Sequence, residues 1–144
     1  YPGGGPPSRG LSFYAAKNVC GKRNRRLCTG SEWRMACGGR KYPYGGIFDP
    51  TMCNTMSMDG AERAVARSGQ FRRCRSGWGV YDMSGNVAEW TSDGRVRGGD
   101  SYRTAERASC GYSQRRSAGS TSPFVGARCC ADPTLIEQSE GSKK

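Results

Sequence analysis

The apolar residues near the start of the chain recur at a helical period. Residues 11–20 read LSFYAAKNVC, and one amphipathic pattern joins the following positions: Tyr14, Ala15, Ala16, Val19 and Cys20. Ser12 stands just before this pattern and can cap a helix by accepting a hydrogen bond from a backbone N–H. We therefore predict a short helix here.

A second helix is indicated by the capping box TGSE at residues 29–32. In such a box the Thr29 hydroxyl and the Glu32 carboxylate each accept a hydrogen bond from a free N–H at the helix start. Trp33, Ala36 and Cys37 then share one face of the helix. The two glycines at 38–39 end it, because glycine readily takes the left-handed conformation of a C-cap.

Residues 77–92 read GWGVYDMSGNVAEWTS and predict a strand, a tight turn and a second strand. Val80, Tyr81 and Met83 favour the first strand. The turn is expected at 84–86, where glycine and asparagine can take positive φ. An apolar run resumes at 87–90 as the second strand.

Between the second helix and this stretch, residues 53–73 show little period of either kind and predict an irregular loop. The arginines in and just after it could line an anion site: Arg63, Arg67, Arg72, Arg73 and Arg75. Without aromatic interleaving, such arginines more often form a solvated face, which is the interpretation that we prefer.

Composition changes this picture in one respect, because eight cysteines occur among only 144 residues. With 35% hydrophobic residues and 22 glycines, the chain can form one loop-rich domain with a modest core. Disulfides are the expected role of the cysteines, because there is no C-x-x-C spacing and no histidine to complete a zinc site. We therefore expect a secreted, periplasmic or cell-surface protein. No apolar run reaches transmembrane length, and we expect any export signal to have been removed or to lie outside this sequence.

The two ends of the chain differ in composition from its middle. Residues 1–10 (YPGGGPPSRG) are rich in proline and glycine and predict a flexible linker or arm, joined to an upstream domain or assembly subunit. Residues 133–144 are mostly polar and predict a flexible tail. The folded domain is therefore expected at 11–132.

The net charge of +11 indicates acidic partners. Eighteen of the 23 basic residues are arginine, which binds carboxylate and phosphate through two parallel hydrogen bonds. The chemistry favours a glycan, an acidic polymer or another protein as partner, although several arginines could equally have buried structural roles.

Four motifs together resemble one protein family. They are GVYDMSGNVAEWTSD at 79–93, RLCTGSEWRMACGGRKYPYG at 26–45, RGGDSY at 97–102 and FVGARC at 124–129. All four are similar to motifs of the formylglycine-generating enzymes, sulfatase-modifying proteins built on a variant of the C-type-lectin fold. The resemblance spans residues 11–132 and implies an α+β, loop-rich, disulfide-stapled fold with two short helices packed on small antiparallel sheets.

The same resemblance bears on activity. Family oxidases hold copper with two cysteines after the Arg-Gly-Gly motif, at positions that fall near Thr104 and Ser109 here. A hydroxyl cannot replace a thiolate in Cu(I) ligation, so we expect neither copper nor oxidase chemistry. The iron-dependent branch of the family needs histidines that this chain lacks.

We therefore expect a non-catalytic binding or structural module that presents a loop surface at about 100–122. Its candidate ligand-binding residues are Asp100, Tyr102, Arg103, Arg107, Tyr112, Arg115 and Arg116. The same region is where retroelement-diversified lectin-fold proteins vary their binding surface. The alternative is a copper-dependent formylglycine-generating oxidase, or a fragment of one, with copper held by other cysteines.

The resemblance also implies structural calcium. Asn86, Val87 and Glu89 match one family site, and Asn54 and Asp59 a second. Calcium binds carboxylate, amide and carbonyl oxygens, which these residues can supply. The alternative is that the Glu89 carboxylate only forms hydrogen bonds within the turn.

Family disulfides match Cys20 with Cys129 and Cys37 with Cys110. We assign Cys28 to Cys130, because neighbouring strand residues face opposite ways and Cys130 can reach a different partner from Cys129. Cys53–Cys74 remains, and it closes the irregular loop. A vicinal Cys129–Cys130 bond or free thiols are the alternatives.

Overall fold

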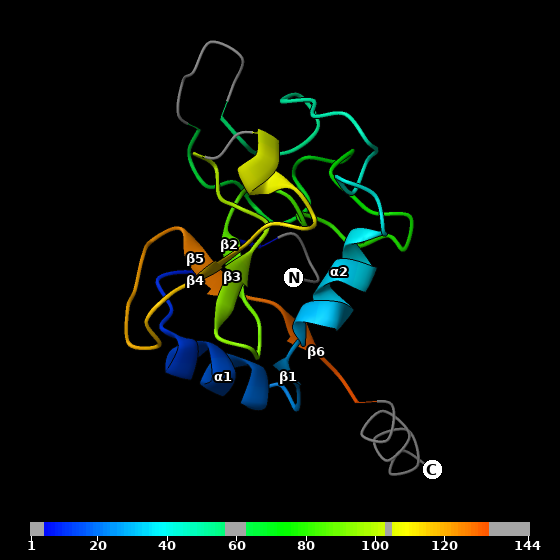
Figure 1. Cartoon of the computed structure of the whole chain (residues 1–144). Coiled ribbons are helices and arrows are strands. Elements are labelled where there is room, and N and C mark those ends of the chain that lie inside the picture. Colours follow the sequence, from blue (N-terminus) through cyan, green and yellow to red (C-terminus); the bar gives the residue numbers. More distant parts are fainter. Residues whose placement is uncertain (1–4, 57–62, 103–104, 133–144) are drawn as a thin grey trace.

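The computed structural model of the chain describes residues 5–56, 63–102 and 105–132. The elements in chain order are α1 (Phe13–Gly21), β1 (Arg26–Leu27), α2 (Gly30–Cys37), β2 (Ala88–Trp90), β3 (Arg95–Arg97), the 3-10 helix η1 (Ala105–Ala108), β4 (Ser113–Arg115), β5 (Val125–Ala127) and β6 (Cys129–Cys130). Figure 1 shows a small central sheet between α1 and the long loops, with α2 at one side. Within these described ranges no helix is long and apolar enough to cross a membrane.

The central sheet has the strand order β4-β3-β2-β5, and a second sheet pairs β1 with β6. Strands β2 and β3 are antiparallel, with Trp90 opposite Val96. In contrast, β2 and β5 run parallel, with Trp90 opposite Ala127. The expectation of α+β architecture with short helices on small sheets is confirmed, although one strand pair is parallel.

Both helices begin where local chemistry predicts. The Ser12 hydroxyl accepts a hydrogen bond from the Ala15 N–H, 3.1 Å away, at the start of α1. Thr29 and Glu32 form the complete capping box of α2, and Gly38 ends that helix in the left-handed conformation. These features need only residues three or four apart, so the sequence alone predicts them.

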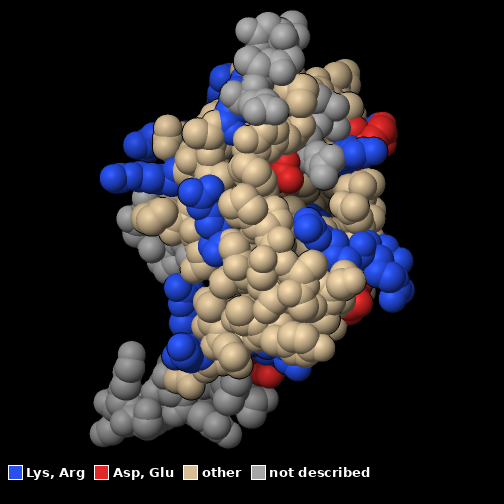
Figure 2. All heavy atoms as spheres, turned by 90° about the vertical axis from the view of Figure 1, so that its left-hand side faces the viewer, with Lys and Arg blue, Asp and Glu red and all other residues tan. Residues whose placement is uncertain are grey.

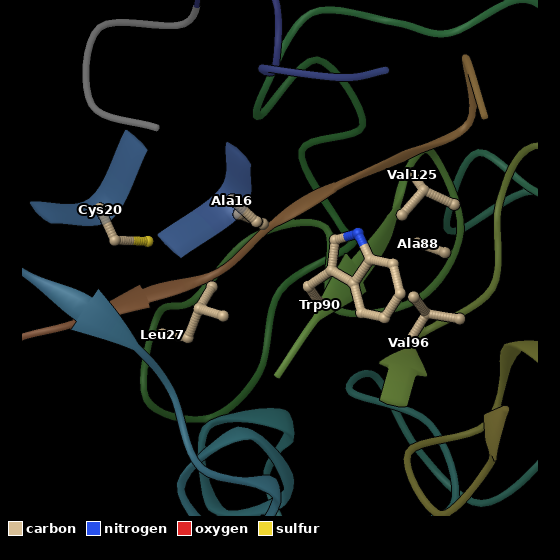
Figure 3. Packing of buried hydrophobic residues seen from close by; sticks show 8 residues of the cluster. Ala16, Cys20, Leu27, Ala88, Trp90, Val96 and Val125 are labelled. Carbon is tan, nitrogen blue, oxygen red and sulfur yellow. The ribbon is translucent and has the colours of Figure 1, made fainter. Parts of the chain in front are cut away.

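The first hydrophobic cluster surrounds Trp90, which has no exposed surface. Figure 3 shows its indole ring beside Ala88, Val96 and Val125, with Ala16, Cys20 and Leu27 further along the same cluster. The Trp90 Nε1–H donates to the Leu11 carbonyl at 2.8 Å, which satisfies the one polar atom of the ring. Phe13 packs against Trp90 edge-on, whereas Tyr14 is 62% exposed.

A second, smaller cluster lies under α2 and contains Trp33, Cys37, Met83 and Cys110. Two small clusters bury little apolar surface for a chain of this size, so covalent links contribute much of the stability.

All eight cysteines form disulfides, and none is free. The pairs are Cys20–Cys129, Cys28–Cys130, Cys37–Cys110 and Cys53–Cys74. They are the pairs given in the sequence analysis, and neither a vicinal bond nor a free thiol is present. The bond between Cys53 and Cys74 spans 21 residues, for which loop closure stabilises the fold by about 3 kcal/mol.

The prediction of a strand–turn–strand at 77–92 is wrong for its first strand. Residues 80–83 form only an isolated bridge between Tyr81 and Arg75. The expected turn instead pairs with distant segments, because the Gly85 N–H donates to the Gly98 carbonyl and the Asn86 N–H to the Asn54 carbonyl, both at 2.7 Å. The hairpin that does form is β2–β3.

The predicted arm contacts the domain over the part that the structure describes. The Ser68 N–H donates to the Gly5 carbonyl at 2.9 Å. A side chain at Gly126 would collide with the Ser8 carbonyl, so the strand β5 needs glycine where this segment crosses it. Residues 5–10 are therefore a packed segment, while residues 1–4 and the predicted tail at 133–144 lie outside the described ranges.

Gly85 lies where a larger residue should destabilise the fold. Its φ is +74°, and an added Cβ would overlap the backbone carbonyl of Asn54. Gly94 has a similar φ of +76°, but nothing lies within 4 Å of the Cβ position. Gly94→Ala should cost about 1–2 kcal/mol for the left-handed backbone alone, and Gly85→Ala about 2 kcal/mol more, because backbone atoms must also move.

Chemical denaturation of both variants and the wild type measures this difference. Equal losses of stability in the two variants would show that the close approach between residues 85 and 54 is not present.

Candidate functional site

Ser109, one of the two positions expected for copper thiolates in this family, has a structural role here. Ser109 is buried, and its hydroxyl donates to the Glu106 carbonyl at 2.8 Å. The neighbouring Cys110 is bonded to Cys37. Thr104 and Arg103 lie outside the described residues. Because every cysteine is in a disulfide, no thiolate is present to bind Cu(I), and these residues do not fit a copper centre.

The loop surface expected at 100–122 divides into buried and exposed residues. Asp100 is 9% exposed, and its carboxylate accepts a hydrogen bond from the Tyr102 N–H at 2.9 Å. Tyr102 packs edge-on against Phe124, with ring centroids 4.4 Å apart. These two residues therefore order the loop. Arg107 and Arg115 are exposed, and Tyr112 and Arg116 are half-buried.

Beside the exposed part of this surface lies a half-buried arginine that the sequence analysis did not select. Arg95 on β3 lies directly opposite Arg115 on the edge strand β4. Like charges at opposed positions repel each other, and a bound anion would remove that repulsion. The Arg95 guanidinium also donates to the Ser113 hydroxyl at 3.2 Å. Only the strand register reveals the Arg95–Arg115 pair.

The opposite sign of charge is scarce on this side of the molecule. Figure 2 shows the left-hand face of Figure 1, on which Lys and Arg side chains are widespread and Asp and Glu are few. This face can therefore attract an acidic partner over a broad area.

Glu89, an expected calcium ligand, lies at the centre of a buried cluster. Its carboxylate forms an ion pair with Arg128, with Nε and Oε2 2.7 Å apart, and accepts a hydrogen bond from the Trp33 indole at 3.3 Å. Burial raises the pKa of Glu89, and the charge of Arg128 limits this rise. The alternative to calcium binding, that Glu89 bonds only within its own turn, does not hold, because Trp33 and Arg128 come from other elements.

Asp82 is the functional candidate that the sequence analysis missed. It lines a cavity of about 20 Å³ together with Val87, Glu89 and Arg128. Burial raises the pKa of Asp82 as well, and one carboxylate oxygen accepts from the Gly69 N–H at 2.8 Å. Its positive φ of 59°, uncommon for a residue other than glycine, is a consequence of tertiary structure that the sequence does not reveal.

Asn54 and Asn86, which were expected in two different calcium sites, lie side by side. The Asn54 amide donates to the Asn86 side-chain oxygen at 2.9 Å and to the Ala64 carbonyl at 2.8 Å. The Asn86 oxygen also accepts from the Ala66 N–H. Both amides therefore hold the loop near residue 65, and the Asn86 side-chain oxygen already accepts from two N–H donors. Asp59 lies outside the described residues.

The cavity beside Asp82 and Glu89 does fit one hard cation. It has room for an atom the size of a water oxygen, and two carboxylates supply the oxygen ligands that calcium prefers. Across the described ranges, no three His, Cys, Asp or Glu side chains gather as a metal site would, so the remaining ligands would be backbone oxygens or water.

Known proteins with similar sequences are found for much of this chain. The chain is 32% identical to the inactive C-alpha-formylglycine-generating enzyme 2 of Mus musculus, over 69% of this chain and 36% of the relative. It is 26% identical to the formylglycine-generating enzyme of Bos taurus, over 85% of this chain and 43% of that enzyme. The chain thus spans less than half the length of either relative.

A solved structure supports the fold independently. Treponema denticola variable protein 1 superimposes with a TM-score of 0.73 and 17% identity, over 89% of this chain and 72% of that protein. Residues 4–133 match the family described as sulfatase-modifying factor enzyme 1-like domains. This match includes all four motifs, and the chain therefore belongs to that family.

Proposed function

We propose that this domain is a non-catalytic binding module of an oxidising compartment, secreted, periplasmic or at a cell surface. The observation that carries the proposal is the use of all eight cysteines in disulfides, which leaves the fold without the thiolates of the oxidase chemistry. The family itself contains members of both kinds, since one relative is named inactive and another is named as an enzyme.

The loop surface is the face that we assign to ligand binding. Loops carried on a rigid scaffold commonly hold binding residues, and here Cys37–Cys110 fixes the middle of the segment to α2. Arg95, Arg107, Arg115 and Arg116 give this surface a positive charge. A glycan, an acidic polymer or an acidic protein surface fits this chemistry.

The alternative function is a copper-dependent oxidase, or part of one. It would require reduction of a disulfide to supply thiolates. The disulfide next to the expected copper position at Ser109 is Cys37–Cys110, which is buried within the cluster under α2. Copper binding would therefore remove a link between α2 and the loop surface.

The test is an assay with a sulfatase-derived cysteine peptide, copper and the fully oxidised chain. We expect no formylglycine above the level of a heat-inactivated sample, while an active family enzyme under the same conditions gives product. Turnover by this chain would contradict the non-catalytic proposal and favour the alternative.

We further infer that the cavity beside Asp82 and Glu89 holds a structural calcium ion. Two carboxylates that are both penalised by burial gain from a nearby positive charge. Arg128 already compensates Glu89, so the ion would mainly offset the charge of Asp82. The ion would connect Asp82 with Glu89 and so stabilise residues 82–89, and it would have no role in catalysis.

Thermal melting with calcium and with a chelator tests this inference. At calcium about 100-fold above its Kd, a native-state site adds about 2.7 kcal/mol of stability. Asp82→Asn should abolish the calcium response, whereas Glu106→Gln, at an exposed ion pair with Lys41, should retain it. Identical melting curves of the wild type in calcium and in chelator would show that no ion is bound.

A further inference from the structure

A shallow hollow of about 740 Å³ lies on another part of the surface, away from the residues of the loop surface. Its lining includes four arginines and two aromatic residues: Arg40, Arg72, Arg73, Arg75, Tyr44 and Trp78. They come from two segments, residues 40–44 after α2 and residues 72–78, which include the end of the irregular loop. Figure 1 shows these segments side by side above α2.

The two segments are held in place by covalent and backbone bonds. The disulfide between Cys53 and Cys74 clamps the end of the irregular loop, and Cys74 lies between Arg73 and Arg75 in sequence. The Tyr44 hydroxyl accepts a hydrogen bond from the Asp49 N–H at 3.0 Å, which fixes the other wall. The hollow is therefore built on rigid backbone.

Three arginines of the hollow differ from the ion-paired arginines of the fold. Arg26, Arg97 and Arg128 each form an ion pair with a carboxylate within 3.0 Å. Arg72, Arg73 and Arg75 are exposed, and none makes an ion pair with any carboxylate of the described ranges. These three guanidinium groups are thus available to an external anion.

One carboxylate, that of Asp49, interacts with the positive charge of Arg73. Arg73 contributes to lowering the pKa of Asp49, although hydrogen bonds from Thr51 are the larger cause. The Asp49 carboxylate accepts from the Thr51 hydroxyl at 2.6 Å and from its N–H at 2.9 Å. Because the Asp49 carboxylate is hydrogen-bonded to Thr51, it offsets little of the charge of the four arginines, and the hollow stays positive.

Trp78 presents its ring to solvent at the edge of the hollow. It is 73% exposed, which is unusual for the largest apolar side chain. The turn that carries it is fixed, because the Ser76 hydroxyl accepts from the Trp78 and Val80 N–H groups and the Gly79 N–H donates to the Ser76 carbonyl. An exposed indole on a rigid turn offers a flat face for stacking at little entropic cost.

The structure therefore supplies what the sequence pattern lacked. The arginines of residues 63–75 were expected to form a solvated face, because Phe71 is the one aromatic residue within that run. Tyr44 and Trp78 come from outside that run, and folding places both beside three of those arginines.

We propose that this hollow binds an acidic polysaccharide, with its sulfate or carboxylate groups on the arginines and one sugar ring on Trp78. Arginine recognises both kinds of anionic group through paired N–H donors. Four arginines along one open hollow suit a ligand that repeats its charge. The disulfides place the protein in an oxidising compartment, which favours a polysaccharide over nucleic acid.

Calorimetric titration of the full, oxidised chain tests the proposal with four ligands at one ionic strength. A heparin oligosaccharide and an oligogalacturonate distinguish sulfate from carboxylate as the preferred group. Neutral dextran and single-stranded DNA are the comparison ligands. We expect one of the two acidic oligosaccharides to bind more tightly than both comparison ligands.

Three variants separate the hollow from general charge. We expect Trp78→Ser to weaken binding about tenfold, because it removes the ring on which the sugar stacks. We expect Arg72→Ser/Arg73→Ser/Arg75→Ser to weaken binding tenfold or more, since each hydrogen bond to a charged group contributes about 1.5–3 kcal/mol. A charge-matched control, Lys22→Ser/Arg25→Ser/Arg34→Ser, removes three exposed cations outside the hollow and should change binding less than about threefold.

The proposal stands only if both hollow variants weaken binding and the control does not. Equal losses in the triple variants, no effect of Trp78→Ser, preference for single-stranded DNA, or no binding would each overturn it. Arg95→Ser/Arg115→Ser separates this site from the loop surface, because loss through that variant alone would locate the ligand there. The peptide assay remains a separate test of the non-catalytic proposal.

Discussion

The buried ion pair between Glu89 and Arg128 is the interaction on which the rest of the structure depends. Glu89 lies on the central strand β2, Arg128 between β5 and β6, and Trp33 on α2 completes the cluster. The pair thus joins the sheet, the second helix and the carboxy-terminal strands. A buried carboxylate is costly unless it is paired, so these elements must come together correctly or not at all.

Local chemistry explains which parts of the fold could be predicted. The capping groups Ser12 and Thr29 act within one helical turn, and the positive φ of Asn86 follows from its residue type. The motifs then indicated the family and its fold. The parallel pairing of β2 with β5 could not be predicted from local chemistry, since it joins residues 37 positions apart (125 − 88) and depends on tertiary packing.

The functional residues were harder to predict for the same reason. Asp82 reaches Glu89 only through a backbone conformation that the sequence did not suggest. Asn54 and Asn86 were assigned to different metal sites, and only the structure reveals that they are hydrogen-bonded to each other. Arg95 and Trp78 gain importance from neighbours on other segments. The fold thus retains the scaffold of an enzyme family, while cationic surfaces stand where ligands can reach them.

A double-mutant cycle on Glu89 and Arg128 is the most direct measurement of the central claim. At pH 7, Arg128→Met should destabilise the domain by about 3 kcal/mol or more, because it leaves the buried Glu89 carboxylate unpaired. Glu89→Gln should cost less, because the Arg128 side chain is 18% exposed and still donates to the Tyr81 carbonyl. The double variant should lose about 1–3 kcal/mol less than the sum of the two. Strictly additive losses would contradict the account, because they would show that the two side chains do not hold the fold through each other.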